Sequence, residues 1–295
     1  MIKEKSKNRA YLFILIGVVL LGTGPLFVKS VDASGVVIAF YRLLFASLML
    51  TGPALVINKK GGSGGKKTKS LKWSILGGLT FALNITLWSV ALKYTTASAV
   101  TLLDNTAPVW VGLFGLLVLG EKRGWKYWFG LAATIIGAAL MIGVDLLTGT
   151  SAQMTGNIIG IASGIAYAAY LLVTNKARST QQSLRYSWLI STFGAIALLP
   201  ITAAVGGFQS PISTQEYFLI FIMALSSQVI AWLLVNQALG ELPAAISSIT
   251  LVGQPVVSTV LGILFLNEIP KTIQLVGGIC CILGIIMAQR SSNHD

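Results

Sequence analysis

The stretch from Ala91 to Gly137 reads ALKYTTASAVTLLDNTAPVWVGLFGLLVLGEKRGWKYWFGLAATIIG, and the chain contains a second version of it. The second version, ALGELPAAISSITLVGQPVVSTVLGILFLNEIPKTIQLVGGICCILG, runs from Ala238 to Gly284, 147 positions later and without a gap. The same offset relates Lys29 to Lys176, Pro108 to Pro255, Glu121 to Glu268, Gly130 to Gly277 and Gly137 to Gly284. Self-similarity at a fixed period indicates a repeat architecture. We therefore expect two repeats in the 295 residues, at 1–147 and 148–295.

The composition indicates a membrane protein. Hydrophobic residues make up 55% of the chain and charged residues only 10%, whereas soluble domains carry about 25% charged residues. Apolar runs of ~20 residues recur along the chain, which is the length needed to cross the hydrocarbon core of a bilayer. The net charge of +12 does not indicate a nucleic-acid partner. The basic residues lie in short loops between apolar segments, where they set orientation in the membrane.

Ten apolar segments of spanning length follow one another, five in each repeat. The first repeat is expected to span at residues 11–29, 34–57, 71–92, 95–119 and 124–144. The second is expected to span at residues 157–174, 184–205, 217–237, 244–266 and 272–288. The predicted fold class is an all-α membrane protein with two five-helix repeats.

The distribution of Lys and Arg predicts the orientation. Loops on the side of the N-terminus hold 17 of the 21 basic residues, and the opposite side holds only Lys29, Lys93 and Lys271. Both termini are therefore expected in the cytoplasm, as in a multi-pass protein of a bacterial-type plasma membrane. An odd number of spans per repeat places the second repeat upside down relative to the first. Inverted repeats of this kind are a recurrent architecture of secondary transporters.

Other kinds of chemistry have little support in the sequence. Cys280 and Cys281 are adjacent within an apolar segment, and His294 is the only histidine. This composition offers no spacing for a metal site or a disulfide framework. The chain contains no HExxH, the motif of metalloproteases. Its one match to GxSxG, GGSGG at residues 61–65, lies in a basic, glycine-rich loop between two apolar segments, without the strand-to-helix context of a serine hydrolase. We expect no cofactor, no metal and no enzymatic activity.

Several stretches resemble one family of membrane proteins. They are TAPVWVGLFGLLVLGEKR (Thr106 to Arg123), GQPVVSTVLGILFLNEIP (Gly253 to Pro270), FYRLLFASLML in the second span and ALNITLWSVALKYTTASAV across the third and fourth. Together they resemble the drug/metabolite transporter superfamily, in its EamA-like branch. The resemblance implies a central cavity lined by spans 1, 3, 4, 6, 8 and 9, with spans 5 and 10 at the periphery. Members of this superfamily move amino acids, nucleotide sugars, quaternary amines or toxic drugs.

Polar residues inside the spans indicate where a substrate would bind, because polar groups facing lipid are costly. A rise of ~1.5 Å per residue places Arg42, Asn84 and Asp104 at similar depth, roughly 12–14 Å below the outer edge. Trp88 and Trp232 each lie four residues after a polar residue, on the same helix face. The candidate substrate-binding residues are Asn84, Trp88, Asn105, Tyr167, Gln228, Trp232 and Gln254.

Each candidate also has a structural interpretation. Asp104 is a candidate for proton coupling, or alternatively forms an ion pair with Arg42. The amides could serve as hydrogen bonds between helices, and Trp88 could belong to an interfacial belt. Pro108 and Pro255 are expected to kink their spans. The remaining candidates are Glu121 and Glu268, as gates or as helix caps, and Gly156, Gly160 and Gly164, as a small-residue packing face.

These features favour a secondary active transporter that works by alternating access. The mixture of Trp, Tyr, Asn and Gln suits export of a small polar or amphipathic metabolite such as an amino acid. A channel, a lipid scramblase, or an importer of an amine, vitamin or sugar conjugate are the alternatives. The expected partners are a small-molecule substrate and the lipid bilayer, with protons as a candidate coupling ion and no nucleic acid. A homodimer is compatible with the sequence.

Overall fold

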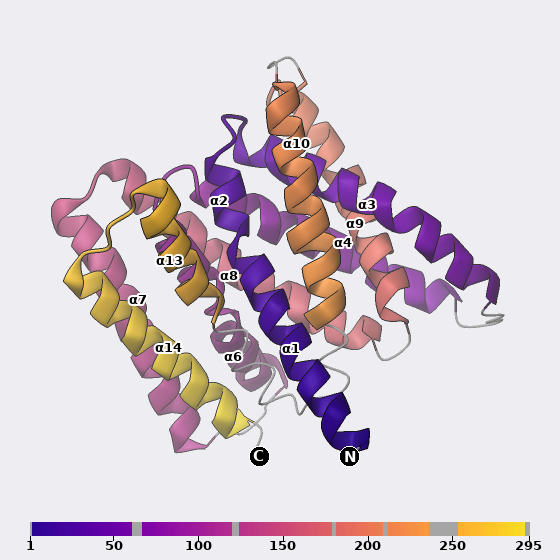
Figure 1. Cartoon of the computed structure of the whole chain (residues 1–295). Coiled ribbons are helices and arrows are strands. Elements are labelled where there is room, and N and C mark those ends of the chain that lie inside the picture. The colour runs from indigo at the N-terminus through magenta and orange to yellow at the C-terminus, as the bar shows by residue number, and fades with distance from the viewer. Residues whose placement is uncertain are drawn as a thin grey trace.

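A computed structural model describes residues 2–60, 67–119, 124–178, 181–208, 212–235 and 253–292. All regular elements within these ranges are helices (Figure 1). They are α1 (Ile2–Gly22), α2 (Gly24–Lys29), α3 (Gly35–Lys60), α4 (Lys67–Ala91), α5 (Ala97–Asp104), α6 (Ala107–Leu119), α7 (Trp125–Thr148), α8 (Ser151–Arg178), α9 (Ser183–Ala204), α10 (Thr214–Met223), η1 (Ala224–Ile230), α13 (Gln254–Leu266) and α14 (Thr272–Ser292).

Helices of membrane-spanning length dominate the described part of the chain. Six are long and apolar enough to cross a bilayer: Tyr11–Lys29, Gly35–Val56, Leu71–Ala91, Ser151–Thr174, Ser183–Ala204 and Thr214–Val235. Gln254–Leu266 and Thr272–Ala288 are shorter apolar helices. The protein is therefore an all-helical, multi-pass membrane protein. The predicted spans 4 and 5 correspond to α5 with α6 and to α7. Glu121 and the first half of predicted span 9 lie outside the described residues.

Three of the long segments are interrupted near the middle of the molecule. Between α1 and α2 the helix breaks at Thr23, whose hydroxyl donates to the Leu20 carbonyl at 2.7 Å. Between α5 and α6 two turn residues, Asn105 and Thr106, precede Pro108. The third segment widens into the π-helix η1 between α10 and Val235. Non-helical backbone at membrane depth is tolerated where protein or a cavity surrounds it.

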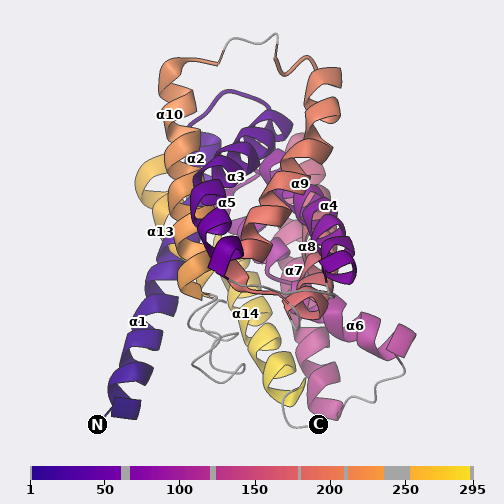
Figure 2. The same cartoon turned by 90° about the vertical axis from the view of Figure 1, so that its right-hand side faces the viewer.

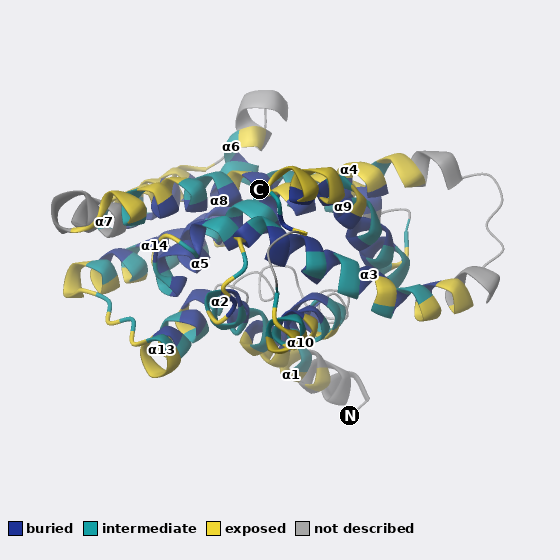
Figure 3. Cartoon of the chain, turned by 90° about the horizontal axis from the view of Figure 1, so that it is seen from above, coloured by how far each residue is buried: buried dark blue, intermediate teal, exposed yellow. Residues whose placement is uncertain are grey.

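The best buried core lies among α3, α4, α8 and α9. Phe40 and Leu43 of α3 pack with Phe81 of α4, Tyr170 of α8 and Ile190 of α9, all at least nine-tenths buried. Seen from above, buried residues occupy the middle of the molecule and exposed residues its perimeter (Figure 3). The outward-facing side chains include many large apolar residues, as expected of a surface that contacts lipid.

α7 and α14 form a separate closely packed pair on one side of the molecule (Figure 1). A Cβ atom on Gly130 would lie 2.7 Å from the Gly284 carbonyl oxygen, and one on Gly137 would lie 2.5 Å from the Gly277 carbonyl oxygen. Such distances are too short for any larger residue, so these glycines allow the two backbones to touch. Small residues at helix contacts serve this purpose in membranes.

The N-terminal end of α1 and the C-terminal end of α14 lie at the same end of the molecule (Figures 1 and 2). The connections from α2 to α3, from α9 to α10 and from α13 to α14 lie toward the opposite end. These connections are the ones that the Lys and Arg distribution assigns to the outer side of the membrane.

Candidate functional site

A polar cavity of about 60 Å³ lies at the level of the helix interruptions. Its wall is formed by residues from α1, α3, α4, α5, α8, the helical segment after η1, and α13. The lining residues are Leu21, Arg42, Phe81, Asn84, Ile85, Trp88, Thr101, Asp104, Tyr167, Trp232 and Gln254. Seven of the nine residues assigned from the sequence to substrate binding, coupling or an ion pair are in this set.

Asp104 is the last residue of α5 and is held by two neutral donors. Asn84 Nδ2 lies 2.8 Å from Asp104 Oδ1, and the Ser163 hydroxyl lies 2.5 Å from the same oxygen. Asn84 Nδ2 also approaches the carbonyl and hydroxyl oxygens of Ser163, each at 3.1 Å. The network joins α4, α5 and α8 across both repeats. Ser163 was not among the residues predicted to contribute to the site. Its position beside Gly160 and Gly164 on α8 was a usable signal, because small residues allow another helix to approach closely.

Arg42 projects into the cavity from α3 without a carboxylate partner. It is 6% exposed, and no residue in the described ranges places a carboxylate oxygen within 4 Å of its guanidinium or accepts a hydrogen bond from it. The guanidinium carbon lies 5.6 Å from the ring centre of Trp88, a cation–π contact. The ion pair between Arg42 and Asp104 that the sequence left open is therefore not formed in this conformation.

Aromatic side chains also contribute to the wall, namely Phe81, Trp88, Tyr167 and Trp232. Behind them, the Tyr170 ring is stacked with the Tyr167 ring at 6.1 Å between centres, meets the Trp232 ring edge to face at 6.4 Å and lies 4.7 Å from the Phe81 ring. A lining that combines charged, polar and aromatic groups suits a small amphipathic molecule.

Two predicted residues do not reach the cavity. Asn105 Nδ2 donates to the Thr101 carbonyl at 2.8 Å, so this amide completes the end of α5. Gln228 is buried within η1, away from the cavity lining. The i, i+4 rule that placed Gln228 beside Trp232 assumes an α-helix, and a π-helix has a wider turn. Leu21, Ile85 and Thr101 line the cavity and were not singled out in the sequence.

The two prolines lie at helix starts. Pro108 is the second residue of α6, and α5 has already ended at Asp104. Pro255 is the second residue of α13. Pro is well tolerated in the first turn of a helix, where its missing N–H has no intrahelical partner. Pro108 thus lies in the first turn of a new helix that follows a break. Because of this break, Asp104 is the C-terminal residue of α5, where it lines the cavity.

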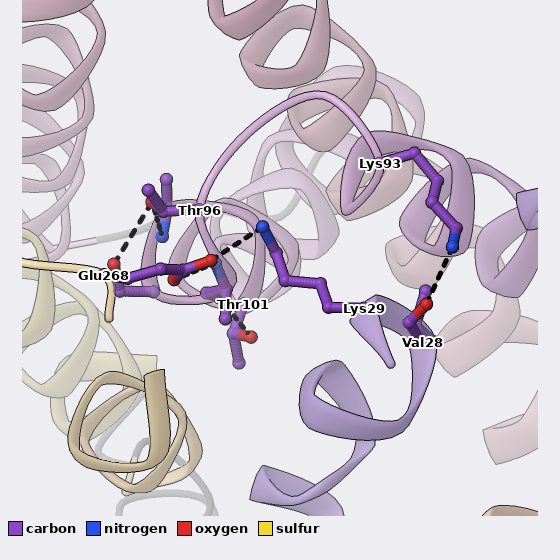
Figure 4. A network of polar contacts seen from close by, with 9 residues as sticks. Val28, Lys29, Lys93, Thr96, Thr101 and Glu268 are labelled. Carbon is purple, nitrogen blue, oxygen red and sulfur yellow. Dashed lines mark hydrogen bonds and ion pairs between the residues drawn. The ribbon is translucent and has the colours of Figure 1, made fainter. Parts of the chain in front are cut away.

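A set of polar contacts, which we name the outer clasp, joins the loops at the end opposite the termini (Figure 4). Lys29 Nζ lies 2.6 Å from Glu268 Oε1, and Glu268 Oε2 accepts a hydrogen bond from the Ala97 N–H at 2.8 Å. Lys93 donates to the carbonyl oxygens of Val28, at 2.9 Å, and Val31. Burial lowers the pKa of Lys93 below the usual lysine value.

Glu216 adds a further contact to the outer clasp. Its Oε1 accepts a hydrogen bond from the Asp32 N–H at 2.8 Å, and its Oε2 completes a capping box with Ser213 at the start of α10. The outer clasp thus ties together the loops after α2, before α5, before α10 and after α13. Its contact at Ala97 lies at the first residue of α5, and Thr101 and Asp104 of the same helix line the cavity, roughly 6 and 10 Å further along the helix axis.

A larger, apolar cavity of about 190 Å³ lies between α5, α13 and α14. Its lining consists mainly of aliphatic side chains, among them Leu102, Val260 and Ile279. Val260 and Ile279 are also exposed on the outer surface of the helices. Its polar side chains, Ser98, Thr259 and Gln274, are uncharged and take part in local hydrogen bonds. The smaller cavity, which contains both charged and polar side chains, is therefore the candidate site.

Comparison with known proteins defines the class. The sequence profile of the EamA-like transporter family matches this chain twice, at residues 8–143 and 154–289. The chain belongs to this family, within the drug/metabolite transporter superfamily, and is a multi-pass membrane transporter. A solved crystal structure has the same fold, with a TM-score of 0.59, 16% identity and coverage of 96% of this chain and 97% of that one.

Curated relatives carry transporter names. Two uncharacterized transporters of Archaeoglobus fulgidus are 28% and 26% identical to this chain, over 85% and 94% of it and 86% and 95% of their own lengths. A probable terminal-alkyne amino-acid exporter of Streptantibioticus cattleyicolor is 26% identical over 67% of this chain and 65% of its own length.

Proposed function

We propose that this protein is a secondary active transporter that exports a small polar or amphipathic metabolite, such as an amino acid, across the plasma membrane. The observation that carries the proposal is the polar cavity, in which Arg42 is buried and Asp104 half-buried without pairing with each other. Charges in the middle of a membrane protein mark substrate or ion pathways because they are otherwise expensive. The probable amino-acid exporter among the relatives agrees with the substrate class.

The proposed architecture is a pair of inverted five-helix repeats. Support comes from the contact between α7 and α14, which the 147-residue offset relates to each other. Gly130 packs against Gly284, which is the counterpart of Gly137, and Gly137 packs against Gly277, which is the counterpart of Gly130. A two-fold axis between the repeats requires such a reciprocal arrangement. Cys280 Sγ lies 3.4 Å from the Ala133 carbonyl oxygen, and these two positions are counterparts, so the axis would pass beside them.

Alternating access would follow from opening one side of the cavity at a time. The outer clasp holds the outer side closed in this conformation, through Lys29 and Glu268. Their counterparts in the other repeats are Lys176 and Glu121, which the orientation rule assigns to the cytoplasmic side. In the proposed cycle, the inner side closes when the outer clasp opens.

Asp104 is the proposed coupling residue. Its carboxyl group faces the cavity and is held through one oxygen by neutral donors, with no cation within 4 Å in the described ranges. A carboxyl group in this situation can take up and release a proton as the cavity changes sides, which buried acids do in proton-driven carriers. Proton entry on one side would then drive substrate exit on the other.

Single cysteines will test the inverted topology. In a background with Cys280 and Cys281 replaced by alanine, Ser63→Cys should be labelled only by reagents that enter the cell. Ser151→Cys should react with a membrane-impermeant maleimide from outside, because it follows the fifth span. Labelling of both positions from the same side would contradict five spans per repeat.

A further inference from the structure

The guanidinium of Arg42 has hydrogen-bonding capacity that the described residues do not use. The side chain is more than nine-tenths buried, it lines the cavity, and its Nε–H has no acceptor. A guanidinium carries five N–H donors in a fixed planar fork. A buried charge without a partner is strongly destabilising. The contacts within the described part of the protein therefore do not offset the free-energy cost of burying the Arg42 charge.

Neither neighbour of Arg42 removes this cost. The Trp88 ring stabilises the cation through its face but accepts no hydrogen bond in the plane of the guanidinium. Asp104 attracts Arg42 through the cavity, yet the two do not approach within 4 Å, and Oδ1 of Asp104 already accepts from Asn84 and Ser163. Arg42 therefore lines the cavity in which a substrate would lie without a hydrogen bond to any described residue.

We propose that Arg42 is the anchor for a carboxylate group of the substrate, a step that rests on the transporter function proposed above. A carboxylate matches the guanidinium fork with two parallel hydrogen bonds. The substrate class is then a small amphipathic carboxylate, amino acids included. Its apolar part would lie against the aromatic wall formed by Tyr167 and Trp232.

A phosphate ester is a poorer match to this cavity. A group of nearly two negative charges would require several cations, and among the described residues Arg42 is the only Lys or Arg that lines the cavity. A primary amine without a carboxylate would leave the guanidinium unsatisfied and add a second cation beside it. The wild-type protein is therefore expected to discriminate among ligands by the presence of a single carboxylate.

Two matched sets of probes test this anchor by calorimetry or thermal shift on the purified, full-length protein. They are leucine, isopentylamine and isocaproate, and phenylalanine, phenylethylamine and phenylpropionate. At least one carboxylate-bearing probe should bind, and the amine of the same set should bind more weakly. In Arg42→Gln the Kd of that carboxylate should rise by roughly 10- to 100-fold, the range for hydrogen bonds to a charged group, while that of the amine should not rise.

Two further variants separate anchoring from folding. Arg42→Lys keeps the charge but loses the fork, so its affinity should fall between those of wild type and Arg42→Gln. Arg185 is the matched control, because its Nε is also buried and without a partner but lies outside the cavity lining. Arg185→Gln should bind the probes like wild type. If Arg42→Gln does not fold, the wild-type preference for carboxylate over amine remains a test.

The results that would refute carboxylate binding by Arg42 differ from those that would refute the transporter function. Equal binding of a carboxylate by wild type and Arg42→Gln would refute the anchor, as would binding of amines alone or of none of the six probes. A probe that binds through Arg42 but shows no counterflow in vesicles would instead refute the transporter function and leave the anchor standing.

Discussion

Asp104→Asn is expected to abolish pH-driven accumulation of substrate while exchange of substrate for substrate continues. Asparagine has the size of aspartate, and its side-chain oxygen can still accept hydrogen bonds from Asn84 and Ser163. The variant loses the negative charge and with it the ability to bind and release a proton. Because Arg42 forms no ion pair with Asp104 in this structure, the yield of folded protein should remain close to that of wild type.

Ser163→Ala is the matched control for this prediction. It removes one hydrogen bond to the carboxylate but leaves the titratable group in place. Accumulation should persist, because the carboxyl group that binds and releases the proton is still present. The assay is uptake into inverted vesicles with an imposed pH gradient. Accumulation at the wild-type rate by Asp104→Asn would rule out the coupling role.

Glu268→Ala is expected to open the outer side of the cavity. The variant removes both the ion pair with Lys29 and the acceptor at the start of α5, where side-chain capping also stabilises the helix. The Lys29 and Glu268 side chains are only 20% and 13% exposed, so their pairing should exceed that of ordinary surface ion pairs. A loss of ~1–2 kcal/mol from the closed state would raise the outward-open population roughly tenfold.

The opening can be measured at Thr101, which lines the cavity on α5. With Cys280 and Cys281 replaced by alanine, Thr101→Cys should react slowly with an impermeant thiol reagent applied from outside. Adding Glu268→Ala should accelerate this reaction roughly tenfold. Glu268→Gln keeps an acceptor for the Ala97 N–H and should have a smaller effect. Unchanged labelling in Glu268→Ala would mean that the outer clasp does not control access.

The repeat and the composition were sufficient to predict a helical membrane transporter, but they could not predict the helix interruptions. Pro108 indicated a kink, whereas the structure ends α5 at Asp104 and begins α6 at Ala107. The break depends on Asn105 and Thr106, whose side chains bond to the carbonyls of Thr101 and Leu103. Local side-chain bonds of this kind compete with the helix, and hydropathy does not register them.

Depth within the membrane brought together three residues that line one cavity. Arg42, Asn84 and Asp104 are placed at one level by the rise per residue, and all three are in the lining. Gln228 is not in the lining, and it lies in a π-helix, where the α-helical spacing assumed for the pair with Trp232 does not hold. The donors to Asp104 required knowledge of how α4, α5 and α8 pack, which involves residues far apart in the sequence.

The central proposal, a carrier that exposes one cavity alternately to each side, is tested most directly by counterflow. Purified protein is reconstituted into vesicles loaded with an excess of unlabelled leucine or phenylalanine, and uptake of the same labelled amino acid is followed without an ion gradient. A carrier binds and returns with substrate, so the label should accumulate transiently above equilibrium, with a rate that saturates. Uptake that never exceeds equilibrium and rises linearly with concentration would identify a channel and contradict the proposed function.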